Sequence, residues 1–303
     1  MRTLFMGTPE FAVPCLNTLK EKTDLTGVVT QPDAPRGRGY TLTPPPVKAA
    51  ANGTAPVYQP HTLKNEAFLD ELNALNPDLI VVVAYGKILP GYILDFPKFG
   101  CINVHASLLP KYRGAAPIQR AVMNGERESG VTTMMMDAGI DTGDILLMKK
   151  IPLAPDETGG SLHDKLSLLG AEVLGDTLDL LISGKLTRTP QQDELSTYAH
   201  MIDKKTGLID WNRPAAEIYN LIRGLNPYPL AYTYTGGKML KIIKASLCGT
   251  NELRPGQTKK TDAGLAAGTG GGGLRIEEVK LEGRGAMSIH EFLKGNTINL
   301  TGG

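Results

Sequence analysis

Residues 100–110 read GCINVHASLLP, and this stretch decides how the chain is interpreted. Side chains alternate between the two faces of a strand, so Asn103 and His105 project from one face while Ile102 and Val104 project from the other. The strand then breaks into a Ser-Leu-Leu-Pro turn. Two hydrogen-bonding side chains are therefore expected at the carboxyl end of a strand, where open α/β sheets keep their sites.

A carboxylate follows later in the chain. Residues 139–144 read GIDTGD, and the glycines on either side of Asp141 make a loop that can bring this side chain to His105. Asp144, at the end of the same loop, is the alternative carboxylate. The residues alone predict a polar cluster of Asn103, His105 and one of these two aspartates.

Short apolar runs alternate with helical patterns through about the first two hundred residues. The run 79–84, LIVVVA, is continuously apolar, as expected of a central strand covered on both faces. Helices are expected over 65–75 and over 161–182, the second with Ser161 as N-cap. The alternation predicts an α/β fold with a doubly wound, mostly parallel sheet. We expect its strands at residues 3–6, 27–30, 56–58, 79–84, 101–105, 131–136 and 145–149.

The pattern changes in the last third of the chain. Residues 184–205 show no sustained apolar periodicity and are read as a linker. A helix is then expected over 214–223, followed by a hairpin of strands 231–234 and 239–243 around Gly236-Gly237. The glycine-rich stretch 264–273 is expected to be a flexible loop. Several short strands with one helix predict a small β-barrel, although the pattern fits a small sandwich equally well.

Length and cysteine usage fit a two-domain protein of a reducing compartment. The 303 residues exceed one typical domain. Cys15, Cys101 and Cys248 lie far apart with no metal-type spacing, which argues against a disulfide framework. No signal-peptide core is seen, and no apolar run approaches the roughly 20 residues of a membrane span. We therefore expect a cytoplasmic protein without membrane contact or bound metal.

Charge is distributed unevenly along the chain. Residues 204–303 hold fourteen Lys or Arg against eight Asp or Glu, a net charge of +6. Because the whole chain carries +1, residues 1–203 carry −5. An acidic body joined to a basic tail is compatible with a nucleic-acid partner, and equally with chance scatter of surface charge.

Further stretches make a family resemblance specific. Asn-x-His-x-Ser-Leu-Leu-Pro at 103–110, Tyr-Arg-Gly at 112–114 and Asp-Thr-Gly-Asp at 141–144 together resemble the formyltransferases that use 10-formyltetrahydrofolate. Within that family, the chain resembles the members that formylate methionyl-tRNA. That narrower match rests on GTPEF at 7–11, on QPD at 31–33 through PVK at 46–48, and on IDW at 209–211. The resemblance covers nearly the whole chain.

The resemblance implies a catalytic set of Asn103, His105 and Asp141, with Asp144 closing the turn. Formyl transfer to an amine passes through a tetrahedral intermediate with negative charge on the formyl oxygen, so it needs hydrogen-bond donors and a proton carrier. Asn103 can donate through its amide and His105 when protonated, while Asp141 can orient the imidazole or take the amine's proton. Cys101 lies on the same strand face, but direct attack by an amine needs no thiolate.

The resemblance also implies 10-formyltetrahydrofolate as the co-substrate that donates the formyl group. Gly7-Thr8-Pro9 lacks the G-x-G-x-x-G pattern, and Pro9 has no backbone N–H, so a nicotinamide cofactor is not expected. The folate is expected to contact two segments, the turn Ser107, Leu108, Leu109 and Pro110, and the strand end at Tyr85, Gly86, Ile88 and Leu89.

Two further regions are implied to meet initiator methionyl-tRNA. Residues 32–46 form a long, proline-rich loop with Arg36 and Arg38, and such loops are usually functional or disordered. Arg38, between two glycines, is suited to a phosphate or a base edge. The chain departs from the family's more basic pattern at Tyr40 and Thr41. In the tail, Lys241 and Lys244 are expected on the nucleic-acid face of an OB-like barrel.

The expected organisation is a catalytic domain at 1–189, a linker at 190–205 and an OB-like tRNA-binding domain at 206–303. The implied activity is transfer of a formyl group to the α-amine of methionine on initiator tRNA, a step in the initiation of protein synthesis. Three alternatives stay open: a small amine acceptor such as an amino-sugar nucleotide or glycinamide ribonucleotide, a hydrolase that releases formate, and a non-catalytic RNA-binding protein.

Overall fold

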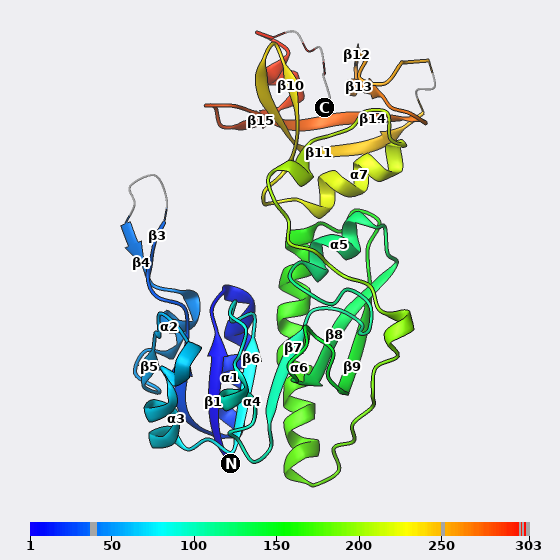
Figure 1. Cartoon of the computed structure of the whole chain (residues 1–303). Helices are drawn as coiled ribbons and strands as arrows, with labels where there is room; N and C mark the ends of the chain where they lie inside the picture. The colour runs from blue at the N-terminus through cyan, green and yellow to red at the C-terminus, as the bar shows by residue number, and fades with distance from the viewer. Residues whose placement is uncertain (37–40, 250–251, 297, 299, 301–303) are drawn as a thin grey trace. The chain divides into compact units, whose positions relative to one another are not determined.

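The computed structural model describes residues 1–36, 41–249, 252–296, 298 and 300. The chain forms two compact units (Figure 1). The first comprises residues 1–114, 129–151 and 163–198, and the second comprises 115–128, 152–162 and 199–303. The second unit thus takes in two short segments from the middle of the chain. The domain boundaries at 189 and 205 stay predictions.

A seven-stranded sheet forms the centre of the first unit. Neighbouring strands follow the order β5-β2-β1-β6-β7-β8-β9, and every pair from β5 to β7 is parallel while β7 and β8 are antiparallel. The predicted doubly wound, mostly parallel sheet is therefore confirmed, with strand ends shifted by a few residues. The strands are β1 (Arg2–Gly7), β2 (Asp24–Val29), β5 (Val57–Tyr58), β6 (Leu79–Val83), β7 (Cys101–His105), β8 (Glu128–Met135) and β9 (Ile145–Pro152).

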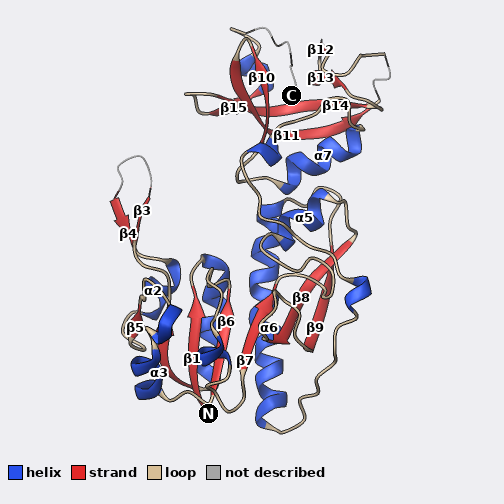
Figure 2. Ribbon diagram, viewed as in Figure 1, coloured by secondary structure: helices blue, strands red, loops and turns tan. Residues whose placement is uncertain are grey.

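Different helices cover the two faces of this sheet. The chain leaves β1 for β2 on one side and later returns to β6 on the other, so right-handed crossovers place α1 (Val13–Lys22) and α3 (Leu69–Leu75) on opposite faces. Phe68, Leu72 and Leu75 pack with Leu4 and Ile80 on the α3 face. Figure 2 shows the alternation of strands and helices. The remaining helices of more than one turn that involve this unit are α2 (Pro46–Ala51), α4 (Gly91–Leu94) and α6 (Gly159–Ile182).

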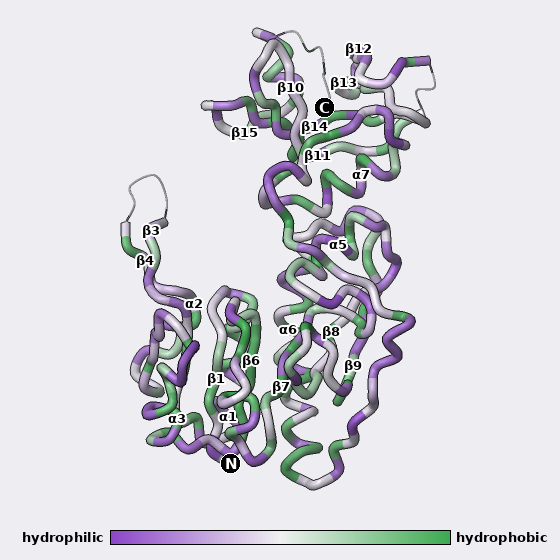
Figure 3. Tube along the Cα trace, viewed as in Figure 1, coloured by the Kyte–Doolittle hydropathy of each residue, from purple (hydrophilic) through white to green (hydrophobic). Residues whose placement is uncertain are grey.

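The central strand β6 is buried along its whole length, as its apolar sequence predicts. The hydropathy-coloured tube is hydrophobic there (Figure 3). Burial of both faces of β6 fixes its neighbour β7, which pairs Val82 with Asn103 on one side and Met134 with Asn103 on the other. The carboxyl end of β7 is consequently a rigid support for the side chains that it carries.

Two predicted helix starts differ from the structure. The helix expected from Asn65 begins at Leu69, because Asn65 and Glu66 adopt left-handed backbone with φ of 54° and 58°. The helix expected from Ser161 begins at Gly159. The hydroxyl of Thr158 accepts the N–H of Ser161 at 3.0 Å, and the hydroxyl of Ser161 accepts the N–H of Thr158 at 3.0 Å, so the cap is one turn earlier than predicted.

The second unit is built on an antiparallel sheet. Its strands pair in the order β10-β11-β14-β13-β12, with β15 on β14, and register shifts near Lys244 interrupt the pairing of the long β11. The expected small barrel-like domain is confirmed. Helix α7 (Ala215–Gly224) packs on α5 (Pro117–Met123) and on β11. The other elements are β10 (Ala231–Thr235), β11 (Lys238–Cys248), β12 (Thr258–Thr261), β13 (Gly264–Gly268), β14 (Gly273–Leu281), β15 (Ala286–Ser288) and α8 (Ile289–Phe292).

The expected loop at 264–273 is wrong for most of its length. Residues 264–268 form β13, buried throughout between β12 and β14. A Cβ added at Gly268 would lie 2.3 Å from the carbonyl oxygen of Arg254, so this glycine permits close backbone packing. Only residues 269–272 are outside strands. Among the described residues of the whole chain, no helix has the length and apolarity that a membrane crossing requires.

Candidate active site

Asn103, His105 and Asp141 meet at the carboxyl end of β7. Asn103 is half-buried and His105 is buried, and the loop after β8 brings the Asp141 carboxylate to both. Asn103 Nδ2 donates to Asp141 Oδ1 at 3.1 Å, and His105 Nδ1 lies 3.6 Å from Asp141 Oδ2. The Asp141 side chain is 15% exposed. The three side chains predicted to form one cluster are thus adjacent, and the cluster is reachable from solvent.

The hydrogen bond of the His105 ring determines which nitrogen faces the cluster. His105 Nε2 lies 2.8 Å from the carbonyl oxygen of Tyr112. A carbonyl oxygen only accepts, so Nε2 must carry a hydrogen in either charge state of the ring. Nδ1 is then the atom that gains or loses a proton, and it is the atom that faces Asp141.

Each oxygen of the Asp141 carboxylate accepts a hydrogen bond. Besides the Asn103 amide at Oδ1, the backbone N–H of Gly114 donates to Oδ2 at 2.8 Å. Asp141 adopts a left-handed conformation with φ of 54°, which costs about 1–3 kcal/mol for a residue with a Cβ. The surrounding contacts therefore hold this residue in an unfavourable backbone conformation, and they do so at the place where its carboxylate is needed.

Gln191 connects the Asp141 loop to a buried arginine. Gln191 Nε2 donates to the carbonyl oxygens of Asp141 at 2.9 Å and of Gly143 at 2.7 Å. Gln191 Oε1 accepts from Arg113 Nε at 3.0 Å and from Arg113 Nη2 at 2.8 Å. Arg113 is 2% exposed and also reaches Asp193 at 2.7 Å. Sequence reasoning placed residues 190–205 in a linker and missed these contacts.

Hydrogen bonds that the sequence pattern does not predict close the loop that carries Asp141. Asp137 Oδ1 accepts the N–H of Gly139 at 3.0 Å and the hydroxyl of Thr142 at 2.6 Å. The carbonyl of Asp144 accepts the N–H of Met135 at 2.9 Å, so Asp144 closes the turn through its backbone. A Cβ added at Gly143 would lie 1.8 Å from the carbonyl oxygen of Met135, so only glycine fits there.

Gly143→Ala is therefore expected to lower the free energy of unfolding by about 1–3 kcal/mol, because the added methyl forces the loop away from β8. Chemical denaturation measures this loss. Gly285→Ala is the matched control, since a Cβ at Gly285 meets nothing within 4 Å. Equal stabilities of the two variants would contradict the close approach at Gly143.

The turn expected to contact folate has two half-buried and two buried members. Ser107 and Leu109 are buried, and Thr132 fastens both: its hydroxyl donates to the Ser107 carbonyl at 2.7 Å and accepts the Leu109 N–H at 3.2 Å. The Ser107 hydroxyl donates to the Lys111 carbonyl at 2.6 Å. Leu108 and Pro110 are half-buried, so their side chains are the accessible part of this turn.

The second segment expected to contact folate, at the end of β6, also has accessible and buried members. Gly86 is exposed, and Ile88 is 81% exposed, an unusual position for a large apolar side chain. Tyr85 and Leu89 instead lie in the core beside α3. Burial, and secondarily Tyr92, raises the pKa of Tyr85 to about 12, so its hydroxyl stays neutral. Ile140, directly before Asp141, is also 58% exposed.

Cys101 is not a nucleophile in this structure. It is 1% exposed, and its thiol donates to the carbonyl of Ile93 at 3.5 Å. Burial, and secondarily Asp95, raises the pKa of Cys101 to about 12, so the thiolate is not formed near neutral pH. A mechanism through a thiolate of Cys101 is therefore not supported.

The residues expected to contact tRNA belong to the loop after β2 and to the strand β11. Arg36 ends β3 (Ala34–Arg36), which pairs with β4 (Thr41–Thr43), and Arg38 lies outside the described residues. Lys241 and Lys244 both lie on β11. Lys241 Nζ donates to the carbonyl of Pro229 at 3.0 Å, and Lys244 Nζ lies 3.3 Å from a carboxylate oxygen of Glu277.

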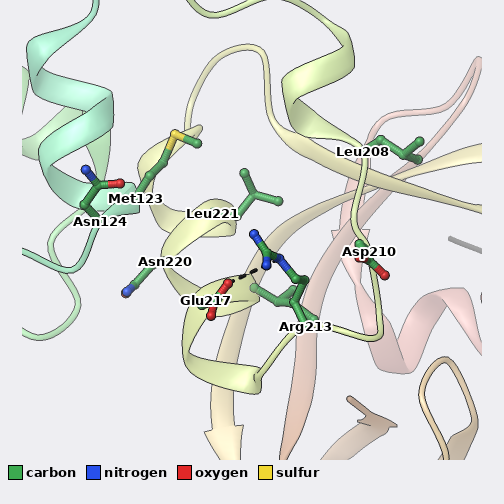
Figure 4. A pocket seen from close by; sticks show the side chains of 9 residues that line it. Met123, Asn124, Leu208, Asp210, Arg213, Glu217, Asn220 and Leu221 are labelled. Atoms are coloured by element: carbon green, nitrogen blue, oxygen red, sulfur yellow. Dashed lines mark ion pairs between the residues drawn. The ribbon is translucent and has the colours of Figure 1, made fainter. Parts of the chain in front are cut away.

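The second unit contains a hollow of about 520 Å³ between α5 and α7 (Figure 4). An ion pair of 3.3 Å between Arg213 and Glu217 spans part of it. It contains none of the three clustered residues, and the described residues nowhere gather three or more His, Cys, Asp or Glu as for a metal ion. The hollow is lined by Met123, Asn124, Leu208, Asp210, Arg213, Glu217, Ile218, Asn220 and Leu221.

The fold is shared with solved enzymes of low sequence identity. An N-formyltransferase from Helicobacter canadensis, in complex with folinic acid and dTDP-3-aminofucose, aligns with a TM-score of 0.69 at 22% identity, covering 90% of this chain and 98% of that one. HypX from Aquifex aeolicus, in complex with tetrahydrofolic acid, aligns with a TM-score of 0.65 at 17% identity, covering 99% of this chain and 50% of that one.

Curated relatives found by sequence share far more identical residues with this chain than these solved structures do. The methionyl-tRNA formyltransferase of Geobacter sulfurreducens is 52% identical over 299 residues, which is 97% of this chain and 94% of that protein. That of Caldanaerobacter subterraneus subsp. tengcongensis is 54% identical over 303 residues, 98% of each. The formyl transferase family model matches residues 1–178, and the model of the formyl transferase C-terminal domain matches residues 201–297. With matches over both units and a majority of identical residues to these relatives, the chain belongs to the formyltransferase family, in its methionyl-tRNA formyltransferase branch.

Proposed function

We propose that the protein transfers the formyl group of 10-formyltetrahydrofolate to the α-amine of methionine on initiator tRNA, in the cytoplasm where initiator tRNA is charged. Family membership and relatives that carry the name methionyl-tRNA formyltransferase support the reaction. The observation that carries the proposal is the Asp141 carboxylate, which accepts the Asn103 amide and faces His105 Nδ1.

Asn103 and His105 act on the formyl oxygen in this proposal. The amine attacks the formyl carbon, and the C=O bond becomes a C–O⁻ bond of a tetrahedral intermediate. One N–H of Asn103 is bound to Asp141, which leaves its second N–H for the oxyanion. A protonated His105 Nδ1 is the second donor. Such donors act most strongly when they are fixed before the charge appears, as β7 fixes these two.

Proton transfer completes the reaction. The attacking amine must lose a proton, and N10 of the folate must gain one as the C–N bond breaks. Asp141 accepts the amine's proton directly or through a water, and His105 Nδ1, which faces this carboxylate, delivers a proton to N10. The amine bond forms and the folate bond breaks without a covalent enzyme intermediate.

The folate is proposed to lie against apolar side chains of the first unit that are exposed or half-buried. Leu108, Pro110 and Ile88 are the accessible members of the two predicted segments, and Ile140 adds a fourth apolar side chain next to Asp141. Gly86, with φ of +85°, keeps the strand end free of a side chain. Ser107, Leu109, Tyr85 and Leu89 shape this surface from the core, where their side chains are held. The folate compounds named with two structural neighbours support this ligand class.

The tRNA is proposed to contact the Arg36 and Arg38 loop together with Lys241 and Lys244. The described strands on either side of this loop, β3 and β4, pair with each other. Just before β3, Asp33 accepts from Lys48 Nζ at 2.8 Å, and the same nitrogen donates to Gln59 at 2.8 Å. The net charge of +6 on residues 204–303 supports a role of residues 206–303 in binding the phosphate backbone.

Combining Lys241→Ala with Lys244→Ala is expected to weaken binding of methionyl-tRNA and to reduce the slope of log affinity against log salt by about 1–2, because each phosphate contact releases about one counterion. Filter binding across salt concentrations measures the slope. Lys98→Ala is the control, since Lys98 lies just before the amino end of β7, at the opposite end of that strand from His105. An unchanged slope would remove these lysines from the interface.

A formyl-transfer assay with the purified full chain tests the function itself. Charged initiator methionyl-tRNA, an amino-sugar nucleotide and glycinamide ribonucleotide are offered as acceptors, and formate release without acceptor is followed in parallel. We expect transfer to methionyl-tRNA with a kcat/KM far above that for the small amines. Preference for a small amine, or formate release as the main reaction, would overturn the proposal.

A further inference from the structure

We propose that Gln191 is a positioning residue for formyl transfer, which holds the Asp141 carboxylate between Asn103, His105 and Gly114. The inference rests on the proposed function, because it assigns a role in the same reaction. Gln191 touches none of the reacting atoms. It acts through the backbone of the loop that carries Asp141.

The contacts of Gln191 are directed at two backbone carbonyls on either side of Thr142. Its amide nitrogen donates to the carbonyls of Asp141 at 2.9 Å and Gly143 at 2.7 Å, which uses both of its N–H groups. Both carbonyls belong to the loop in which Asp141 has φ of 54°. A left-handed residue with a Cβ persists where its surroundings over-determine it, and Gln191 supplies two of the bonds that do so.

The side-chain oxygen of Gln191, Oε1, also accepts two hydrogen bonds. Arg113 donates to Oε1 from Nε and from Nη2, and this guanidinium is almost fully buried. Since an arginine offers only donors, it fixes the amide so that its nitrogen points to the loop carbonyls. The side chain therefore cannot flip without losing four hydrogen bonds.

The same arginine connects Gln191 to the opposite side of the cluster. Arg113 lies between Tyr112, whose carbonyl accepts His105 Nε2, and Gly114, whose N–H donates to Asp141 Oδ2. Gln191 thus ties the segment that orients the imidazole to the loop that carries the carboxylate. One side chain sets the distance between the two partners of the 3.6 Å His105–Asp141 contact.

The segment that carries Gln191 is itself anchored at both ends. Thr189 exchanges two backbone hydrogen bonds with Ile145 of β9, at 2.8 and 2.9 Å. The carbonyl of Thr197 accepts the N–H of Arg113 at 2.9 Å, and its hydroxyl accepts the N–H of Tyr112 at 2.9 Å. The position of Gln191 is consequently defined from β9 on one side and from the 112–114 turn on the other.

Gln191→Glu is the decisive substitution. It keeps an oxygen for Arg113 and nearly the same volume, but it places a second oxygen against the carbonyls of Asp141 and Gly143. We expect kcat to fall about 100-fold with KM values for folate and methionyl-tRNA near those of the wild type, because a displacement of about 1 Å at reacting groups costs that much. Gln191→Ala should show the same split. Gln192 is the exposed neighbour of Gln191, so Gln192→Ala is the control, and we expect it to keep the kcat of the wild type.

Hydrogen–deuterium exchange provides a readout that does not depend on turnover. Peptides that contain Gly114 and residues 141–143 should exchange faster in Gln191→Glu and in Gln191→Ala than in Gln192→Ala, with melting temperatures of Gln191→Glu and wild type close together. Wild-type kcat, or wild-type exchange, in both Gln191 variants would overturn the inference. If the wild type does not formylate methionyl-tRNA, the proposed function fails, and the exchange readout still tests the hold of Gln191 on Asp141.

Discussion

His105→Ala is expected to lower kcat for formyl transfer by about 10²–10⁴-fold, the usual contribution of a positioned general acid or base. His105 Nδ1 is the nitrogen that faces Asp141, since Nε2 is bound to the Tyr112 carbonyl. Its removal takes away both the second oxyanion donor and the proton carrier for the leaving N10. Single-turnover formylation of methionyl-tRNA measures the chemical step without product release.

His105→Gln separates this role from support of the fold. The amide nitrogen of glutamine reaches the position of Nε2 and keeps the hydrogen bond to Tyr112, but nothing replaces Nδ1. We expect His105→Gln to retain the melting temperature of the wild type and to lose as much kcat as His105→Ala. The exposed His61 provides a matched control, His61→Ala, with unchanged kcat. Activity of His105→Gln near that of the wild type would show that the ring only holds the turn.

The part of the site that follows local periodicity was predictable. Asn103 and His105 lie two residues apart on a strand, and that spacing alone requires them to share a side. The loop carboxylate of Asp141 needed the order of motifs as well, because Asp144 has the same side chain within the same turn. The structure separates the two aspartates: the carboxylate of Asp141 enters the cluster, and the backbone of Asp144 closes the loop.

The rest of the site depends on contacts that sequence patterns do not encode. The Tyr112 carbonyl and the Gly114 N–H are backbone groups, which every residue type possesses. Gln191 reaches Asp141 across 50 residues, so its role appears only when the chain is folded. A polar segment without apolar periodicity predicts a linker for that reason, although this one carries the contacts that fix the Asp141 loop.

Two differences in the fold have backbone causes. Tyr85 was expected at the folate surface, but Ala84 takes φ of 47°, which ends the strand's alternation and turns the Tyr85 side chain into the core. The many glycines of the stretch 264–273 predict a flexible loop. In the structure a Cβ at Gly268 or Gly270 would collide with backbone carbonyls, so glycine there serves close packing rather than flexibility.

Asp141→Asn is expected to lower kcat by about 10²–10⁴-fold, although the side chain keeps its shape. The carboxylate accepts Asn103 Nδ2 at Oδ1 and Gly114 N–H at Oδ2. An amide has one oxygen and one NH₂ group, so either orientation places an NH₂ against one of these two donors. The variant also loses the carboxylate oxygen that faces His105 Nδ1, and it loses the group that accepts the amine's proton.

Asp144→Asn is the matched control, because the turn uses the backbone carbonyl of Asp144, which the substitution keeps. Rapid-quench formylation of methionyl-tRNA should show wild-type kcat for Asp144→Asn and the full loss for Asp141→Asn, with folate binding retained in both. The same loss in both variants would mean that the loop tolerates no change at all, and wild-type turnover of Asp141→Asn would mean that the carboxylate neither orients His105 nor handles a proton. Only a selective loss at Asp141 fits a carboxylate that the Asn103 amide and the Gly114 N–H hold on a residue with left-handed backbone, since such a conformation is retained at a cost when the side chain it presents takes part in the chemistry.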